Sequence, residues 1–335
     1  MLKKAVLLFV WAGILVAVIG FTWYQVSAIF KRSLAAPLIV ELLASPTALV
    51  PPVSISTAVL VPSPTLQAKT CGQSGVMTIL FLARDTANGD WPYGADLIRF
   101  VRLDFNNKTI RLIAVPRDLW VETPHLAALN LDHSRLGLVY FRVEQNTTGT
   151  AAQVATASTN AVAQAIYDNY GVAADHYIFF EMRYFAEAID QLGGLDINIP
   201  AAISDSAATF SPGEQHLDGN RALYYARMLP AQELTEGWNR MGRQNLILKA
   251  LIAKLLEPAN ILKIPGLIQQ FREDYITDLS PELITDLACM ADKVPQDQIN
   301  NFQVEPAMII GEGQDNAMLA DTGMVSQFLQ EQLAP

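Results

Sequence analysis

An arginine and an aspartate stand side by side at the end of an apolar run. In "LIAVPRDLW" (112–120), Arg117 and Asp118 follow the apolar residues and a proline. The pair is either a charged turn or a site in which the guanidinium faces an anion and the carboxylate orients it. Because guanidinium forks match phosphate oxygens bidentately, the second interpretation predicts phosphate chemistry at this position.

Two further aspartates also lie where predicted strands end or begin. Asp85 ends "TILFLARD", and Asp96 opens "DLIRFVRLDF". Loops at strand ends are where α/β sheets place ligands. Two carboxylates that meet there can bind Mg²⁺, which takes one or two carboxylates and completes its shell with waters and phosphate oxygens. The alternative is that acidic residues stand at strand ends because loops are solvated.

Basic side chains gather on one predicted helix, at residues 239–256. Arg240, Arg243 and Gln244 share one face of this helix, and Arg227 ends the helix predicted before it. The same side becomes apolar further along, at Ile247, Leu251 and Leu255. A ligand with a phosphate head and a hydrocarbon tail matches this layout. An ordinary amphipathic helix with solvated arginines is the alternative.

These residues need a scaffold, and the chain after residue 75 alternates between strand and helix patterns. Strands are predicted at 76–85, 96–105, 109–116, 176–181, 195–200 and 300–306. Helices are predicted at 151–170, 182–194, 217–227, 239–256 and 325–332, and a loop-rich stretch separates residues 116 and 151. Such alternation predicts one α/β domain with a central mixed β-sheet covered by helices on both faces.

The N-terminal residues differ in composition from the rest of the chain. Residues 5–30 are predicted as a transmembrane helix after a short N-terminus of residues 1–4, because about 20 apolar residues span a bilayer. A cleaved signal peptide is the alternative, but the run is long and ends in a Lys-Arg pair. Residues 31–74, rich in Pro, Ser and Ala, are predicted as a spacer. Its apolar patches lie either on the membrane or on the domain.

Charge and cysteine content exclude two classes of function. The formal net charge of −10 argues against general nucleic-acid binding, which needs a cationic surface. Cys71 and Cys289 are too distant in sequence to suggest a zinc cluster. If the domain lies outside the cytoplasm, a disulfide between them is consistent with that compartment. Two free buried thiols are the alternative.

Several stretches, taken together, resemble the LytR-CpsA-Psr family across residues 76–257. They are "ILFLARD", "GADLIRFVRLDFNNKTIRLIAVPRDLWVETP", "LNLDHSRLG", "HYIFFEMRYFAEAIDQLGGLDINIP", "PGEQHLDGNRALYYARM" and "NRMGRQNLILKALIAKL". The family has a short cytoplasmic N-terminus, one transmembrane helix and an extracytoplasmic α/β domain that binds polyprenyl pyrophosphate. Its members transfer a glycopolymer from that lipid carrier to peptidoglycan in a Mg²⁺-dependent phosphotransfer.

The resemblance implies a single-pass cell-membrane protein whose extracytoplasmic domain spans residues 75–335. The implied partners are a polyprenyl-(pyro)phosphate-linked glycan and peptidoglycan, with no nucleic acid. The implied metal ligands for Mg²⁺ are Asp85 and Asp96, which with Arg117 form the implied catalytic set. The implied pyrophosphate-binding residues are Arg117, Arg227, Arg240, Arg243 and Gln244.

This chain departs from the family pattern at several cationic positions. Where the family carries arginine or lysine, this chain has Gly94, Leu229, Ala128 and Ala87, and Gly237 replaces a family aspartate. The candidate substitutes are Arg84, Arg99 and Glu236. If nothing substitutes, catalysis is weak, and this motivates the first of two alternatives to glycopolymer transfer. One is a non-catalytic polyprenyl-phosphate-binding protein, and the other is a lipid pyrophosphate hydrolase.

Overall fold

The computed structural model describes residues 35–41, 70–85, 94–230, 234–255, 257–261, 263, 266–267, 270–271 and 275–334. The N-terminal segment and the transmembrane helix predicted at 1–30 lie outside these residues, as does most of the predicted spacer. Among the helices that are described, none combines the length and the apolar character that a membrane crossing requires.

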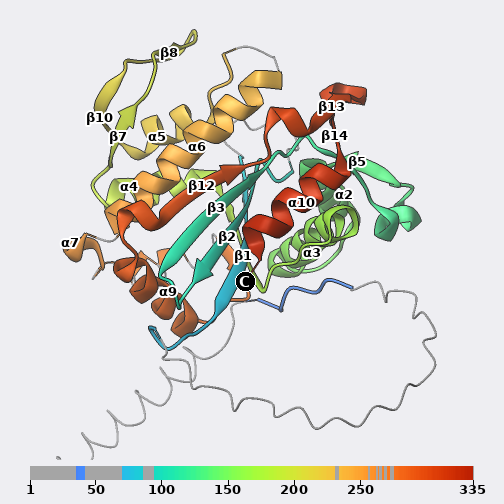
Figure 1. Cartoon of the computed structure of the whole chain (residues 1–335), viewed down its shortest axis with the longest axis horizontal. Coiled ribbons are helices and arrows are strands. Elements are labelled where there is room, and N and C mark those ends of the chain that lie inside the picture. Colours follow the sequence, from blue (N-terminus) through green and yellow to red (C-terminus); the bar gives the residue numbers. More distant parts are fainter. Residues whose placement is uncertain are drawn as a thin grey trace, which may run out of the picture.

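A mixed β-sheet forms the centre of the domain (Figure 1). In the described part of the chain it has six strands, in the order β11-β6-β1-β2-β3-β12. They are β1 (Val76–Arg84), β2 (Leu97–Asp104), β3 (Thr109–Val115), β6 (His176–Glu181), β11 (Tyr275–Thr277) and β12 (Ile299–Gln303). Strands β1, β2 and β3 form an antiparallel meander, while β6 runs parallel to β1 and β12 parallel to β3. The predicted mixed sheet is confirmed.

Helices cover both faces of the sheet (Figure 1). Helices α2 (Leu136–Asn146), α3 (Ala151–Tyr170) and α10 (Thr322–Leu333) lie on one face, where Leu82, Phe100 and Ile113 point. Helices α6 (Leu234–Leu255) and α9 (Pro281–Lys293) lie on the other, where Leu103 and Leu112 point. Neighbouring residues of a strand point to opposite faces, so Leu112 and Ile113 serve different cores.

A smaller unit packs beside the sheet. It contains α4 (Met182–Gln191), β7 (Leu195–Ile199), β10 (Gly213–Leu217) and α5 (Gly219–Arg227), whose apolar side chains form a separate cluster with α6. The other elements are β4 (Trp120–Glu122), β5 (His133–Arg135), β8 (Ile203–Ser204), β9 (Thr209–Phe210), β13 (Ile309–Glu312), β14 (Met318–Ala320) and α7 (Pro258–Ile261). Short 3-10 helices occur at Pro124–Leu129, Gln296–Gln298, Pro306–Met308 and Gln314–Asn316.

Helix α2 corrects the prediction of a loop-rich stretch between residues 116 and 151. Its buried residues Leu136, Val139, Tyr140 and Val143 recur with the spacing of one helical face. That signal was present in the sequence, but it extends over only three turns and is flanked by polar residues. The two short strands β4 and β5 also lie in this stretch and pair antiparallel with each other.

Part of the predicted spacer lies on the domain. Residues 35–41 run extended along α3, where the backbone N–H of Glu41 donates to Gln164 Oε1 at 2.7 Å. Leu38 packs against the main core. Of the two locations left open for the apolar patches of the spacer, this segment takes the domain surface.

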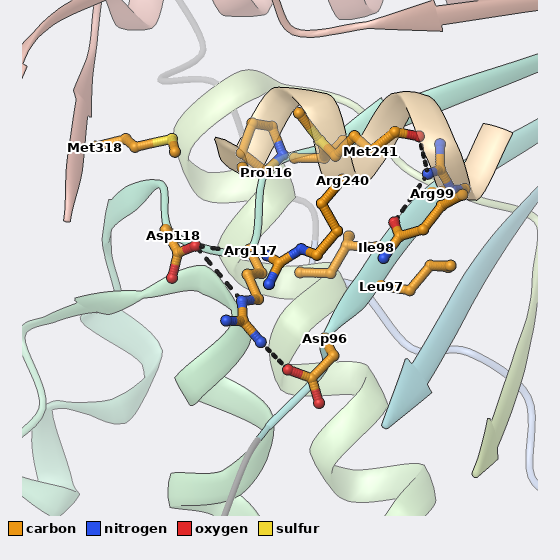
Figure 2. A pocket seen from close by; sticks show the side chains of 13 residues that line it. Asp96, Leu97, Ile98, Arg99, Pro116, Arg117, Asp118, Arg240, Met241 and Met318 are labelled. Carbon is orange, nitrogen blue, oxygen red and sulfur yellow. Dashed lines mark hydrogen bonds and ion pairs between the residues drawn. The ribbon is translucent and has the colours of Figure 1, made fainter. Parts of the chain in front are cut away.

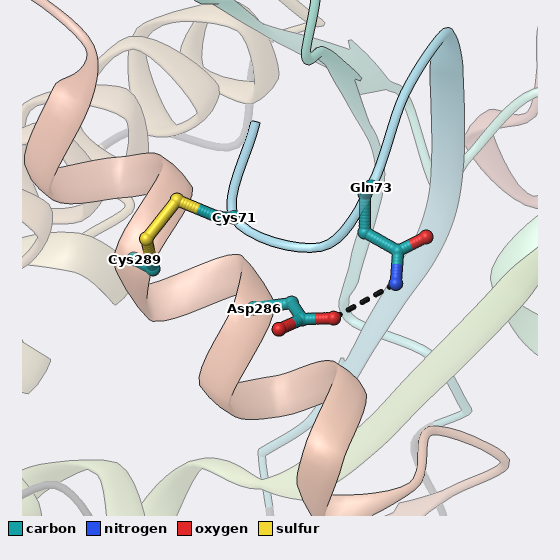
Figure 3. Close-up of a disulfide and its surroundings, with 4 residues drawn as sticks. All are labelled: Cys71, Gln73, Asp286 and Cys289. Carbon is teal, nitrogen blue, oxygen red and sulfur yellow. Dashed lines mark hydrogen bonds between the residues drawn. A yellow bond between two sulfur atoms is a disulfide. The ribbon is translucent and has the colours of Figure 1, made fainter. Parts of the chain in front are cut away.

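A disulfide joins Cys71, just before β1, to Cys289 of α9 (Figure 3). The two Cα atoms are 5.7 Å apart, and 218 residues separate the cysteines in sequence. Beside the bridge, Gln73 Nε2 donates to Asp286 Oδ2 at 2.8 Å. Of the two alternatives for the cysteines, the structure therefore has the bridge.

Reduction of this disulfide is expected to lower the free energy of unfolding by roughly 3 kcal/mol, because the bridge restricts a long loop of the unfolded chain. Urea unfolding of the full-length chain in detergent, with and without a reductant, measures the change. A Cys71→Ser/Cys289→Ser variant serves as the control, because its unfolding midpoint should be low and insensitive to reductant. Equal midpoints for the oxidised and reduced protein would contradict the prediction.

Candidate functional site

Charged residues from distant parts of the chain meet at one end of β1, β2 and β3 (Figure 2). Asp96 stands at the start of β2, Arg117 and Asp118 follow β3, and Arg240 belongs to α6. Arg117 Nη1 donates to Asp96 Oδ1. Asp118 Oδ2 lies 3.5 Å from Arg117 Nε and 3.9 Å from Arg240 Nη2. The fold thus brings Asp96, Arg117 and Asp118 together with Arg240 of α6, as the sequence predicted.

The start of α2 fixes the loops that carry Asp96 and Arg117. Gly137 O accepts a hydrogen bond from the N–H of Ala95 at 2.9 Å, and Gly137 N–H donates to Arg117 O at 2.7 Å. A Cβ atom on Gly94 would lie only 1.7 Å from Gly137 O. Glycine at 94 therefore permits direct backbone contact here. The same contact leaves no room for the arginine that the family pattern has at this position.

Gly94→Ala is expected to destabilise the protein by about 1–3 kcal/mol, because the added methyl group forces two backbones apart. Gly242→Ala is the matched control. A Cβ at Gly242 meets nothing within 4 Å, and alanine in a helix stabilises by about 0.5–1 kcal/mol over glycine. Urea unfolding midpoints of both variants test the pair. A Gly94→Ala protein as stable as the wild type would show that the backbone contact is not required.

The two aspartates predicted as metal ligands lie side by side. The backbone N–H of Asp85 donates to Asp96 Oδ2 at 2.9 Å, and Asp85 Oδ1 lies 3.6 Å from Arg227 Nη1. Burial raises the pKa of the Asp96 carboxyl, and the negative charge of Asp85 adds to this rise, whereas Arg117 acts to lower it. The raised pKa of Asp96 therefore reflects its burial, which outweighs the arginines beside it.

This donor set fits Mg²⁺ only in the presence of a phosphate ligand. Across the described ranges, no group of three or more His, Cys, Asp or Glu side chains is arranged to bind a metal ion. Mg²⁺ does not need such a group, since it typically takes one or two carboxylates and fills its shell with waters and phosphate oxygens. Asp85 and Asp96 can supply those two carboxylates.

Arg99 is a buried cation that makes no ion pair with a carboxylate among the residues the structure describes. Its side chain points from β2 towards α6 and is 1% exposed. It donates to Asn245 Oδ1, to Gln244 Oε1 at 3.1 Å and to Met241 O at 3.2 Å, and these are all uncharged acceptors. Burial lowers the pKa of Arg99 to about 9, so the group is charged at pH 7. Burying an unpaired charge is costly, which indicates an anionic partner.

The other arginines of the site also have donors to spare. Burial, together with the positive charge of the neighbouring Arg117, lowers the pKa of Arg240 to about 10. Arg243 donates to Met228 O and lies 3.8 Å from Glu236 Oε2. Within the described structure, the buried Nε atoms of Arg99, Arg240 and Arg243 have no hydrogen-bond partner. These nitrogen atoms are donors that an anion can use.

Two small cavities border the site. The first, of about 10 Å³, is lined by Asp96, Arg99, Arg117, Asp118, Arg240 and Gln244, among others. The second, of about 60 Å³, is lined by Asp96, Arg117, Asp118, Arg135 and the start of α2. The apolar side of α6 is packed within the protein, since Ile247 is 1% exposed and belongs to the cluster of β7 and α5. A hydrocarbon tail along this side therefore requires these elements to separate.

The three candidate substitutes have different surroundings. Arg99 lines the cavity beside Asp96, and Glu236 lies near Arg243. Arg84 instead pairs with Glu144 at 2.5 Å and Glu181 at 2.7 Å, and it lines a separate cavity. Arg99 is therefore the cation that is best placed to replace a missing one.

The positions at which this chain lacks a family cation, or the family aspartate, have different surroundings. Leu229 is 41% exposed, and Gly237 lines the cavity beside Asp96. Ala128 is exposed in the 3-10 helix Pro124–Leu129, and residue 87 lies outside the described ranges.

Sequence reasoning missed Arg135. Its Nη1 lies 3.5 Å from Asp118 Oδ1, and its side chain lines the cavity of about 60 Å³. The residue precedes α2, within the stretch predicted as loop, so a lone arginine there gave no signal. Asp118 is consequently near Arg117, Arg135 and Arg240, and its carboxylate positions all three guanidinium groups.

The chain is similar to known proteins in sequence and in fold. The model of the LytR_cpsA_psr family matches residues 56–332. The polyisoprenyl-teichoic acid–peptidoglycan teichoic acid transferase TagV of Bacillus subtilis (strain 168) is 26% identical over 214 residues, which are 60% of this chain and 49% of TagV. TagU of Oceanobacillus iheyensis, whose name describes the same transfer, is 23% identical over 215 residues, 64% of this chain and 62% of TagU.

The chain therefore spans about half to somewhat under two thirds of the length of these curated relatives. The crystal structure of B. subtilis TagV superposes with a TM-score of 0.59 at 23% identity and covers 78% of this chain and 98% of that chain. At this level of identity, the likeness shows a shared fold.

Proposed function

Because the chain belongs to the LytR_cpsA_psr family, we propose that it transfers a glycopolymer from a polyprenyl pyrophosphate carrier to peptidoglycan during cell-envelope assembly. The names of the curated relatives describe transfer of teichoic acid from a polyisoprenyl-linked form to peptidoglycan. One observation carries the proposal, namely that buried arginines with unused donors surround an aspartate pair. Such a site matches a diphosphate that carries a metal ion.

In the proposed reaction, a hydroxyl of the acceptor sugar attacks the phosphorus on the glycan side of the diphosphate. A phosphodiester bond forms, the bond from that phosphorus to the bridging oxygen breaks, and lipid monophosphate leaves with the electron pair. Asp85 accepts the hydroxyl proton, because arginines such as Arg117 stay protonated. Asp85 and Asp96 would hold Mg²⁺, which would act as a Lewis acid and neutralise charge on the phosphate oxygens.

The arginines bind the diphosphate and stabilise the charge that develops on the leaving phosphate. Arg117 and Arg240 are pre-positioned by Asp118, so they need little reorganisation when the ligand arrives. Arg99 adds a charge from the buried side of the cavity, where it is held by the side chains of Gln244 and Asn245. Arg227, whose Nη1 lies 3.6 Å from Asp85 Oδ1, binds the diphosphate beside Asp85.

We also propose that the chain is a single-pass protein of the cell membrane, anchored by residues 5–30, with its catalytic domain outside the cytoplasm. The disulfide between Cys71 and Cys289 supports this location, because structural disulfides persist in oxidising compartments and are rare in the cytosol. The net charge of −10 supports a partner other than nucleic acid.

The test uses the full-length chain in detergent with a polyprenyl-pyrophosphate-linked oligosaccharide, MgCl₂ and peptidoglycan sacculi. The expected result is oligosaccharide bound covalently to muropeptides in mass spectra, with release of an equal amount of lipid monophosphate and loss of both in EDTA. No covalent product at any Mg²⁺ concentration would overturn the proposal.

Two alternatives have distinct outcomes in the same assay. Hydrolysis in ¹⁸O-labelled water would place the label in the phosphate of a released oligosaccharide. A binding-only protein would co-purify with polyprenyl phosphate yet remain inert. Leu229 stands where the family pattern has an arginine, and this favours the binding-only alternative over hydrolysis, because hydrolysis also needs the cations that stabilise the leaving phosphate.

A further inference from the structure

A cavity of about 260 Å³ lies beside Arg84, and it is larger than the two cavities of about 10 and 60 Å³ next to Asp96. Tyr140 and Phe179 belong to its lining, and their buried rings stack on each other at a centroid distance of 4.6 Å. Tyr184 forms part of the wall. The site proposed for the diphosphate does not use this cavity.

The rim of the cavity is charged and accessible. The Arg84 guanidinium lies between Glu144, at 2.5 Å, and Glu181, at 2.7 Å, and it is 5.8 Å above the Phe179 ring. The three charged side chains are between 20% and 28% exposed. Arg84 Nε is buried without a hydrogen-bond partner in the described structure.

This combination of groups favours a saccharide. Two carboxylates against one guanidinium leave a net negative charge, so the cavity disfavours a phosphate. Carboxylates accept strong hydrogen bonds from hydroxyl groups, and guanidinium groups donate them. Val154, Tyr184 and Ile276 add apolar surface for one face of a sugar ring, in keeping with ligand sites that combine apolar walls with a few polar groups.

Helix α2 connects this cavity to the proposed reaction centre. Gly137 and Leu138 line the cavity beside Asp96, whereas Tyr140 and Glu144 line the larger one. A helix rises 1.5 Å per residue, so Leu138 and Glu144 are ~9 Å apart along α2. Arg84 is the last residue of β1 and directly precedes Asp85. A glycan chain that occupies the larger cavity can therefore extend to Asp85.

We propose that the cavity beside Arg84 is the acceptor subsite, which binds one sugar of the glycan while a neighbouring sugar presents its hydroxyl to Asp85. The role as acceptor subsite rests on the proposed function, whereas saccharide binding in the cavity does not. The ~9 Å offset along α2 implies that the acceptor must be longer than a single sugar.

Saturation-transfer NMR tests binding, with the full-length chain in detergent and chitotetraose, a soluble tetramer of N-acetylglucosamine, as the probe. Chitotetraose should bind the wild type. Glu144→Gln and Glu181→Gln should each weaken binding about tenfold, the loss expected for one charge-assisted hydrogen bond. Glu187→Gln, at an exposed position of α4, is the matched control and should bind as the wild type does. Asp96→Asn should also bind normally.

A second variant keeps the test valid if loss of the ion pairs disturbs folding. Ala151→Phe places a bulky ring at an exposed position on the rim, at the start of α3, and should block the cavity without removing an ion pair. In the transfer assay this variant should raise the KM for peptidoglycan at least about tenfold and leave the KM for the lipid-linked donor unchanged.

The outcomes separate the subsite from the proposed function. Transfer by a wild-type protein that binds no chitotetraose, or an unchanged acceptor KM in Ala151→Phe, would overturn the subsite alone. Chitotetraose binding that requires Glu144 and Glu181, in a protein that transfers nothing, would support the saccharide site and overturn the transferase. Binding of an amine-bearing stem peptide in the cavity, with no binding of chitotetraose, would overturn the choice of a saccharide.

Discussion

Replacing Asp96 with asparagine is expected to lower the rate of glycopolymer transfer about 10²–10³-fold, which is the usual loss when one preorganised charge-stabilising group is removed from an active site. Asparagine retains an oxygen that can accept the N–H of Asp85, so the loop should keep its conformation. The negative charge disappears, however, and with it both the ion pair to Arg117 and one of the two carboxylates proposed to bind Mg²⁺. Initial rates of transfer to sacculi, measured over a range of MgCl₂ concentrations, test this expectation.

A matched substitution separates loss of chemistry from loss of stability. Asp104 is also buried and stands at the opposite end of the same strand, where it accepts hydrogen bonds from Asn106 and Asn107. Asp104→Asn should therefore reduce stability and leave the transfer rate of the folded protein unchanged. Full Mg²⁺-dependent transfer by Asp96→Asn would remove Asp96 from the reaction.

The residues that meet at the site were identifiable from sequence mainly because they flank strands of one meander. The end of β1 is hydrogen-bonded to the start of β2, and the start of β2 pairs with the end of β3. Asp85, Asp96 and Arg117 therefore had to lie at the same end of these strands. Apolar, β-branched runs made those strands visible. The position of α6 beside these strand ends depends on tertiary packing, which hydrophobic periodicity does not predict. The family resemblance was what assigned the arginines of α6 to the same site.

Gly94 shows what a comparison of motifs misses. In the sequence it counts as a lost arginine, and it suggests a weakened site. In the structure, the backbone of α2 occupies the space where any side chain at 94 would lie, so the glycine is what allows α2 to fix the loops of Asp96 and Arg117. Contacts between segments distant in sequence decide this role, and no local pattern encodes them.

The sequence did not show which face of the sheet Arg99 occupies. The strand "LIRFVRLD" contains two arginines, at 99 and 102, and period-two alternation assigns them to opposite faces of the sheet without saying which face carries the site. The packing of α6 resolves this ambiguity. Arg99 points to α6 and the cavity, while Arg102 lies 3.6 Å from Asp104.

This difference makes the two arginines a matched pair for mutation. Arg99→Met should lower the rate of transfer about 10²–10³-fold, because the proposed site for the diphosphate then lacks a preorganised cation. Arg102→Met makes the same change on the same strand, at 2% exposure against 1% for Arg99, but removes a cation already paired with Asp104. It should leave transfer by the folded protein unchanged.

Ligand-induced stabilisation distinguishes a role of Arg99 in binding from a purely structural one. Farnesyl pyrophosphate with Mg²⁺ should raise the Tm of the wild type and of Arg102→Met, because a ligand that binds the folded state stabilises it by mass action. Arg99→Met should show little increase at the same concentration, whatever its Tm without ligand. An equal rise in Tm for Arg99→Met would mean that Arg99 only fills space beneath α6. In that case, binding of a diphosphate would not be the reason that the chain keeps the Arg99 charge buried without an ion pair.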